Sequence, residues 1–236
     1  MKIIVDERMR QIEKQKLKEL GYDLIDIKQS EKVYPEISSH VDIFTCKIGD
    51  VLIVEPSQYE QIKSKLTSEN KIISGQENIS LKYPDDIKYN VCTIGKKAIH
   101  NFQYTDTIVK QELIKQGYEL ISTNQGYTNC SIAIIDDNSA IVTDKGLYKI
   151  LQKNNIDVLY LQYEPEIKLL NGNEYSNKKG FIGGVISRIA NQIVVTGDLD
   201  KIDPSGLIRK FVLSKGLGIV EFKGLDVIDY GGIVVI

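Results

Sequence analysis

The sequence predicts an α/β fold in which one ββαβ unit occurs five times within a single domain spanning residues 1–236. Three observations predict it: helical segments lead into strands through similar exits, strand pairs precede those helices, and the two ends of the chain carry complementary halves of one unit. Internal repetition of this kind is typical of arrays and propellers. We therefore expect a five-bladed propeller with pseudo-five-fold symmetry, closed by pairing of the N- and C-terminal strands.

The clearest repetition joins the end of a helix to the start of a strand. Residues 16–27 read KLKELGYDLIDI and residues 111–122 read QELIKQGYELIS, so both segments pass through Gly-Tyr into an apolar strand. Looser copies of this exit begin at Asn70, Asn154 and Lys215. The left-handed conformation that often follows the last turn of a helix is expected at Gly21, Gly117 and Gly216.

Each exit follows a segment whose apolar residues recur at intervals of three and four, which places them on one face of a helix. These segments run from Met9 to Leu20, from Tyr59 to Leu66, from Ile108 to Leu113, from Leu147 to Leu151 and from Leu207 to Val212. Asp203 followed by Pro204 predicts the start of the last helix. A carboxylate caps the first turn of a helix well, and proline suits the first helical position.

Strand pairs precede the last four of these helices. They cover residues 40–46 with 50–55, 89–95 with 97–101, 129–136 with 139–144, and 183–189 with 192–198. The fifth pair is split, because residues 230–236 read YGGIVVI and residues 1–7 read MKIIVDE. Joining these two segments would close a ring and remove exposed sheet edges. The alternative is an ordinary α/β sheet with accidental internal similarity.

Composition and charge exclude several classes of function. The net charge is −2, with 30 basic and 32 acidic residues interleaved, so we expect no nucleic-acid partner. No apolar stretch reaches the length of a membrane span, and the charged residues 6–10 are unlike a signal peptide. Three widely spaced cysteines and two histidines predict neither disulfides nor a structural zinc site, which favours a cytoplasmic location.

Polar residues mark the starts of three of the predicted first strands. His40-Val41-Asp42 opens one repeat, Thr128-Asn129-Cys130 lies two repeats later, and Asp229-Tyr230-Gly231-Gly232 follows two repeats after that. This pattern, H-x-D, cysteine and an acidic residue before x-Gly-Gly on five ββαβ units, resembles the pentein or guanidine-modifying enzyme fold. The cyclic order is similar to that of agmatine deiminases. The resemblance covers nearly the whole chain at the level of the repeats.

The resemblance implies a cysteine-dependent hydrolase or transferase that acts on a guanidino or amidino group of a small molecule. The reaction would pass through a covalent thiol intermediate and need no metal or cofactor. Cys130 would be the nucleophile, His40 the general acid and base, and Asp229 would stand where the family has a glutamate. The implied substrate-binding residues are Asp42, Asn129, Gly231 and Gly232.

These residue types suit that chemistry. A guanidinium is a poor electrophile, and a thiolate is the strongest nucleophile among side chains. A cysteine beside a protonated histidine or a bound cation has a lowered pKa, so we expect an activated thiol. Carboxylates accept the paired N–H groups of a planar cation, and a histidine exchanges protons near neutral pH.

Two departures from the family pattern favour a second hypothesis. Asp229 is about one methylene shorter than glutamate, and residues 180–184 read GFIGG where these enzymes often supply a further substrate aspartate. The chain would then be a catalytically silent binding module, as is a ribosome anti-association factor of the same fold. A structural or oligomeric partner protein is a third reading. Substrate, oligomeric state and the choice between hydrolysis and transfer stay open.

Each candidate residue also has a purely structural interpretation. Cys130 would then be a small buried apolar residue, which is how we interpret Cys46 and Cys92. His40 would be a satisfied polar side chain, and Gly231 would serve the backbone geometry of a turn. We expect His100 at the surface. The polar stretch Gln162–Lys179 is expected to be a loop.

Overall fold

One arrangement of strands and helix recurs through the fold. The computed structural model describes residues 1–172 and 174–236, and in that part of the chain five sheets have three strands each. In each of them, the middle strand pairs antiparallel with one neighbour and parallel with the other, and a helix connects the parallel pair. The predicted α/β class is therefore confirmed.

The elements of these sheets fall into four sets according to their place in the repeat. The first strands are β17 (Val234–Val235), β3 (Thr45–Ile48), β6 (Cys92–Ile94), β9 (Ile132–Asp136) and β14 (Ile186–Ile189). The middle strands are β1 (Lys2–Asp6), β4 (Val51–Val54), β7 (Lys97–His100), β10 (Ser139–Val142) and β15 (Gln192–Val195). The connecting helices are α1 (Gln11–Glu19), α3 (Pro56–Lys63), α4 (Thr107–Lys115), α6 (Lys145–Lys153) and α7 (Leu207–Ser214). The third strands are β2 (Asp23–Ile27), β5 (Lys71–Ser74), β8 (Glu119–Ser122), β11 (Asp157–Tyr160) and β16 (Gly218–Val220).

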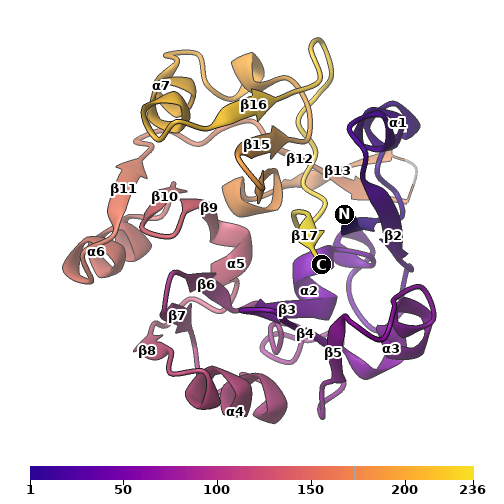
Figure 1. Ribbon diagram of the computed structural model, residues 1–236. Helices are drawn as coiled ribbons and strands as arrows, with labels where there is room; N and C mark the ends of the chain where they lie inside the picture. The colour runs from indigo at the N-terminus through magenta and orange to yellow at the C-terminus, as the bar shows by residue number, and fades with distance from the viewer. Residues whose placement is uncertain (173) are drawn as a thin grey trace.

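Burial decreases from the middle strands to the third strands. Every residue of β4 and β10 is buried, whereas none of β5 or β11 is. Figure 1 shows the connecting helices on the outside of the sheets, with β3, β6, β9 and β17 toward the middle of the molecule. A strand that is buried on both faces carries a continuous apolar run, which is why the middle strands are rich in valine and isoleucine.

The two ends of the chain share one sheet. Strand β17 pairs antiparallel with β1, so that Ile3 lies opposite Val235 and Ile4 opposite Val234. Figure 1 accordingly shows the N- and C-termini close together near the middle of the molecule. In the other four sheets a short turn joins the first strand to the middle strand, whereas here the partners come from opposite ends of the sequence.

The helices begin and end largely where the sequence predicts. Asp106 and Asp144 cap α4 and α6 by accepting hydrogen bonds from backbone N–H groups of the first turn. Asp203 does the same for α7, but from further upstream, because that helix begins at Leu207 rather than at Pro204. The predicted left-handed glycines are confirmed, with φ of 88°, 71° and 73° at Gly21, Gly117 and Gly216. No helix in the described residues is long and apolar enough to cross a bilayer.

All five first strands start later than predicted, and a helical turn precedes three of them. These turns are α2 (Val41–Phe44), α5 (Thr128–Ser131) and the 3₁₀ turn η2 (Ile182–Gly184). In α2, the backbone N–H groups of Val41 and Asp42 donate to the carbonyls of Tyr230 and Gly231, and not to an adjacent strand of the same sheet. The residues that the sequence singles out therefore lie in tight turns just before the strands.

Two further predictions are wrong. The stretch Gln162–Lys179 forms a hairpin of β12 (Lys168–Asn171) and β13 (Glu174–Lys179), because Ile167 and Leu169 are buried and anchor it. His100 is fully buried rather than at the surface, since it ends a middle strand. Two more 3₁₀ turns complete the description, η1 (Pro35–Ile37) and η3 (Leu199–Lys201).

Candidate functional site

The turn before β3 and the segment before β17 lie against each other. The N–H of Asp42 donates to the carbonyl of Gly231 at 3.1 Å. Gly231 has φ of +70°, and a Cβ at this position would lie 2.6 Å from both His40 Cβ and Asp42 Oδ1. Only glycine allows this approach, which brings Asp229 beside the His40-Val41-Asp42 turn.

His40 and Asp229 face each other in the protein interior. His40 Nδ1 lies 3.7 Å from Asp229 Oδ1, which is too long for a hydrogen bond, and neither ring nitrogen of His40 has a partner. Burial lowers the pKa of His40, against the opposing effect of the Asp229 charge. Burial likewise raises the pKa of Asp229, against the effects of His40 and of the backbone N–H groups of Phe181 and Gly231. The geometry therefore favours a neutral imidazole.

Cys130 and Asp42 form the second half of the cluster. The thiol of Cys130 donates to Asp42 Oδ2 at 2.8 Å, and Asp42 Oδ1 is buried without a partner. Burial raises the pKa of Asp42 to about 6, although its bonds with Cys130 and Asn90 oppose this. The pKa of Cys130 is raised well above its usual value, first by burial and then by the charges of Asp42 and Asp229.

The raised pKa of Cys130 is therefore the opposite of the lowered pKa that the sequence predicts. Two carboxylates adjoin Cys130, and no Lys, Arg or protonated His among the described residues forms a hydrogen bond or ion pair with them. In this state the thiol keeps its proton. A cation placed between the thiol and the carboxylates would reverse the electrostatic effect.

Asn90 is a member of the cluster that the sequence did not indicate. Its Nδ2 lies 3.0 Å from Cys130 Sγ and 3.2 Å from the carbonyl of Asp42. Its Oδ1 accepts from the backbone N–H of Asn129 at 2.9 Å and of Cys130 at 3.3 Å. The available signal was its place in the repeat, since Asn90 precedes the first strand β6 as Asp42 and Cys130 precede β3 and β9.

The remaining predicted residues line a cavity of about 350 Å³ among the first strands. Asn129, Gly231 and Gly232 contribute to it, together with residues of β3, β9, β14 and β17. His40, Asp42, Cys130 and Asp229 do not line it, and each is at most 3% exposed. The reactive groups are thus closed off beside this cavity rather than open to it.

Gly183 and Gly184 lie against the cluster, and neither position has room for a side chain. A Cβ on Gly184 would collide with the carboxylate of Asp229. A Cβ on Gly183 would lie 2.6 Å from the carbonyl of Cys130. These two positions of η2 pack so closely on the cluster that they accept only glycine.

Aromatic side chains adjoin the cluster. The ring of Tyr127, three residues before Cys130, stacks on Phe181 with centroids 6.2 Å apart and lies 5.9 Å from Tyr83. The Tyr127 hydroxyl donates to Asp86, and the N–H of Phe181 holds Asp229. Phe181 and Tyr83 are both exposed. These rings connect the buried cluster with the surface.

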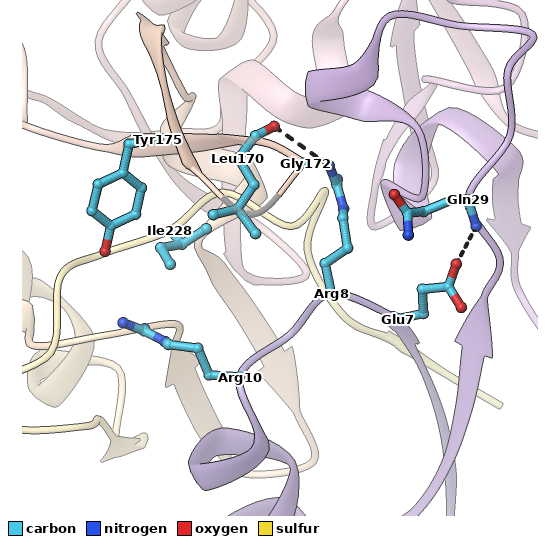
Figure 2. Close-up of a pocket in the computed structure, with 8 residues that line it drawn as sticks. All are labelled: Glu7, Arg8, Arg10, Gln29, Leu170, Gly172, Tyr175 and Ile228. Atoms are coloured by element: carbon cyan, nitrogen blue, oxygen red, sulfur yellow. Dashed lines mark hydrogen bonds between the residues drawn. The ribbon is translucent and has the colours of Figure 1, made fainter.

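A larger cavity, of about 550 Å³, lies elsewhere and contains none of the predicted residues. Figure 2 shows Arg8 and Arg10 on one side of it and Leu170, Tyr175 and Ile228 on the other. Arg8 donates to Asp6 and to backbone carbonyls, and Arg10 pairs with Glu13 at 2.7 Å. Because these arginines already have partners, we do not assign the site to this cavity.

The described residues contain one group of carboxylates close enough to hold a metal ion, at Asp198, Asp200 and Glu221. Lys223 pairs with all three, and Arg209 pairs with Asp200 and Glu221. These ion pairs offset most of the acidic charge, and none of the predicted site residues belongs to this group.

Several solved structures that share this fold are guanidine-modifying enzymes. A DDAH from Pseudomonas aeruginosa, complexed with citrulline, is 11% identical with a TM-score of 0.58, over 95% of this chain and 91% of that one. The amidinotransferase SxtG from Microseira wollei is 11% identical with a TM-score of 0.54, over 89% and 72%. C. jejuni agmatine deiminase is 13% identical with a TM-score of 0.50, over 94% and 75%. The α/β fold is thus that of the pentein enzymes.

Sequence comparison is less informative about activity. No protein with curated annotation matches the chain significantly. Residues 4–234 match the model of a family described as "Family of unknown function (DUF6873)".

Proposed function

Because the chain belongs to the DUF6873 family, whose function is unknown, we propose its activity from its own cluster of residues. The protein is a cysteine-dependent hydrolase or transferase that acts on a guanidino or amidino group of a small molecule. A covalent intermediate on Cys130 connects its two half-reactions.

The observation that carries this proposal is the set of buried polar atoms without partners. Both ring nitrogens of His40 and Oδ1 of Asp42 have none among the described residues, yet all are shielded from solvent. Burial of an unpaired polar group is costly, and such groups are rare in folded proteins. A planar cation with several N–H donors would give Asp42 Oδ1 a partner and would also pair with the Asp229 carboxylate, which otherwise accepts only from backbone N–H groups in the described part of the chain.

The proposed reaction uses these same residues. A guanidinium bound at Asp42 and Asp229 would bring positive charge to the thiol and lower the pKa of Cys130. Neutral His40 accepts the thiol proton, Sγ attacks the central carbon, the C–N bond to the leaving amine breaks, and His40 returns the proton to that amine. Water or a second amine then attacks the carbon bonded to Sγ while His40 takes its proton, the S–C bond breaks, and His40 returns that proton to the departing thiolate.

We also infer that the five three-stranded sheets are the blades of one propeller. Two observations support this: all five sheets have the same strand order, and β1 and β17 complete one of them from opposite ends of the chain. A propeller of this form brings the turns before the first strands together, which is where the candidate residues lie.

A ring-shaped binding module is the second candidate. The crowding of Gly183 and Gly184 against the cluster favours it, because that crowding leaves no place for a further substrate carboxylate. The raised pKa of Cys130 is also what an inert buried thiol would have.

The deciding experiment is labelling with a chloroacetamidine reagent, followed by mass mapping of the modified residue. The enzyme proposal expects saturable labelling of Cys130, protection by a guanidino compound, and slower labelling in His40→Ala. The buried thiols Cys46 and Cys92 serve as internal controls. Equal, slow labelling of all three thiols would reject the enzyme proposal and favour the binding module.

A further inference from the structure

We propose that Asn90 is a positioning residue that fixes the Cys130 turn and stabilises the thiolate through its side-chain amide. The inference rests on the proposed role of Cys130 as nucleophile. Asn90 is fully buried and lies just before β6. It touches the turns before β3 and β9, so that one amide joins the starts of three sheets.

The amide uses its whole hydrogen-bonding capacity. An asparagine side chain has two N–H donors and a carbonyl oxygen with two lone pairs. Here the donors go to Cys130 Sγ and the Asp42 carbonyl, and the oxygen accepts from the N–H groups of Asn129 and Cys130. A hydroxyl or a carboxylate in the same place could not make all four bonds.

The two halves of the amide have different tasks. The oxygen holds the backbone of the turn α5 and so sets the position of Cys130. The Nδ2 donates to the sulfur, and it is the one hydrogen-bond donor to Sγ among the described residues. When the thiol loses its proton, its bond to Asp42 is lost, whereas the bond from Asn90 becomes charge-assisted and stronger.

The test is Asn90→Asp, which keeps the shape and the accepting oxygen but replaces the Nδ2 donor. The readout is the rate of alkylation of Cys130 by iodoacetamide as a function of pH, mapped by mass spectrometry. We expect the apparent pKa of the thiol to rise and alkylation at pH 8 to slow by about tenfold to a hundredfold, because the thiolate loses a hydrogen-bond donor and gains a carboxylate as neighbour. Asn138→Asp, an exposed turn residue, is the matched control and should behave as wild type.

A second measurement covers the case in which Asn90→Asp does not fold. In the wild-type protein, the NMR resonances of the Asn90 side-chain amide should shift with the same pH midpoint as Cys130 alkylation. In Cys130→Ser that transition should be absent. Amide resonances that do not follow the thiol midpoint would overturn the inference, as would an Asn90→Asp alkylation profile within about twofold of wild type.

Failure of this inference can be distinguished from failure of the proposed function. Iodoacetamide carries no guanidino group, so its reaction reports the thiol alone. A shifted profile in a protein that transforms no guanidino compound would support the role of Asn90 and reject the enzyme. Turnover by the wild type, with an unchanged pH profile in Asn90→Asp, would support the enzyme and reject the role of Asn90.

Discussion

The two histidines of the chain are both buried, yet their surroundings differ. His100 has a partner for each ring nitrogen, Thr105 Oγ1 at 2.7 Å and the carbonyl of Gly126 at 2.9 Å. His40 has none, and its nearest charged neighbour is the Asp229 carboxylate at 3.7 Å. Burial lowers the pKa of both, that of His100 to about 4. A buried histidine that the fold satisfies is part of the framework, whereas one left unsatisfied is placed for a partner from outside.

The three cysteines show the same contrast. All are buried, and burial raises the pKa of Cys46 to about 12. Cys46 belongs to an apolar core cluster, whereas Cys130 bonds with a carboxylate and an amide. Burial alone therefore does not distinguish the candidate nucleophile from the other cysteines. What distinguishes Cys130 is the set of polar groups that surround its thiol.

The largest effect is expected for Cys130→Ala compared with Cys46→Ala. If Cys130 is the nucleophile, its removal should lower turnover of a guanidino substrate by at least about a thousandfold, since the reaction loses its covalent step. Cys46→Ala should keep turnover. Steady-state kinetics and thermal unfolding of both variants make the comparison. Activity retained in Cys130→Ala would show that the polar surroundings of this thiol have no catalytic meaning.

The two histidines give the next largest effect when each is replaced by leucine. His40→Leu should lower turnover by about 10²–10⁴-fold, as loss of a general acid and base does, without loss of stability. His100→Leu should keep turnover but lose about 1–3 kcal/mol of unfolding free energy, because the Gly126 carbonyl and Thr105 lose their partner. Urea titrations and kinetics check both. Equal destabilisation by the two variants would abolish the contrast drawn above.

Asp42 should make stability depend on pH. Because folding raises the pKa of Asp42 from 3.8 to about 6, the folded state binds its proton more tightly than the unfolded state. The free energy of unfolding therefore falls as pH rises between these values, by up to about 3 kcal/mol. Asp42→Asn lacks this fall, so it should be more stable than wild type above pH 6, with no difference below about pH 4.

Asp6 is the control for that measurement. Its carboxylate is paired with Arg8 at 2.7 Å and accepts from Ser39 Oγ at 2.6 Å. Asp6→Asn should be less stable than wild type at pH 7, because the Arg8 guanidinium loses the carboxylate that balances its charge. Urea unfolding of both variants across pH 4–8 makes the comparison. A destabilised Asp42→Asn at pH 7 would show that the carboxylate is satisfied in the native state.

The last comparison concerns the glycine that brings the two turns together. Gly231→Ala and Gly216→Ala both place an alanine at φ near +70°. Gly216 has nothing within 4 Å of the added carbon, so its variant should lose only about 1 kcal/mol. Gly231→Ala should lose more, about 2–4 kcal/mol, because the methyl group meets His40 and Asp42. Equal losses in thermal unfolding would mean that the two turns separate easily.

Much of the architecture could be predicted because it repeats. Strand pairs at 40–55 and 129–144 and the exits at Gly21 and Gly117 are local patterns, and similar copies support each other. The starts of the first strands were predicted less accurately. The one-turn helices α2 and α5 are too short to show a helical period, and contacts with distant turns stabilise them.

The site was predicted in part, and the misses have physical causes. His40, Asp42, Cys130 and Asp229 were proposed from the resemblance, and the structure does bring them together. Asn90 escaped notice because an asparagine before a strand is an ordinary turn residue, and only the folded chain places Cys130 against it. The raised pKa of Cys130 depends on the distance between groups on different repeats, which no local pattern encodes.

The pairing of β1 with β17 has a consequence for the order of folding. Ile3 and Val235 must meet across nearly the whole sequence, and closing so long a loop is entropically unfavourable until other contacts shorten it. The sheets whose strands are neighbours in sequence are therefore expected to form first. Asp229 enters the cluster with this last sheet. In a partly folded chain we therefore expect Cys130 to be in place before Asp229 lies opposite His40. The complete cluster would then form only in the last step of folding.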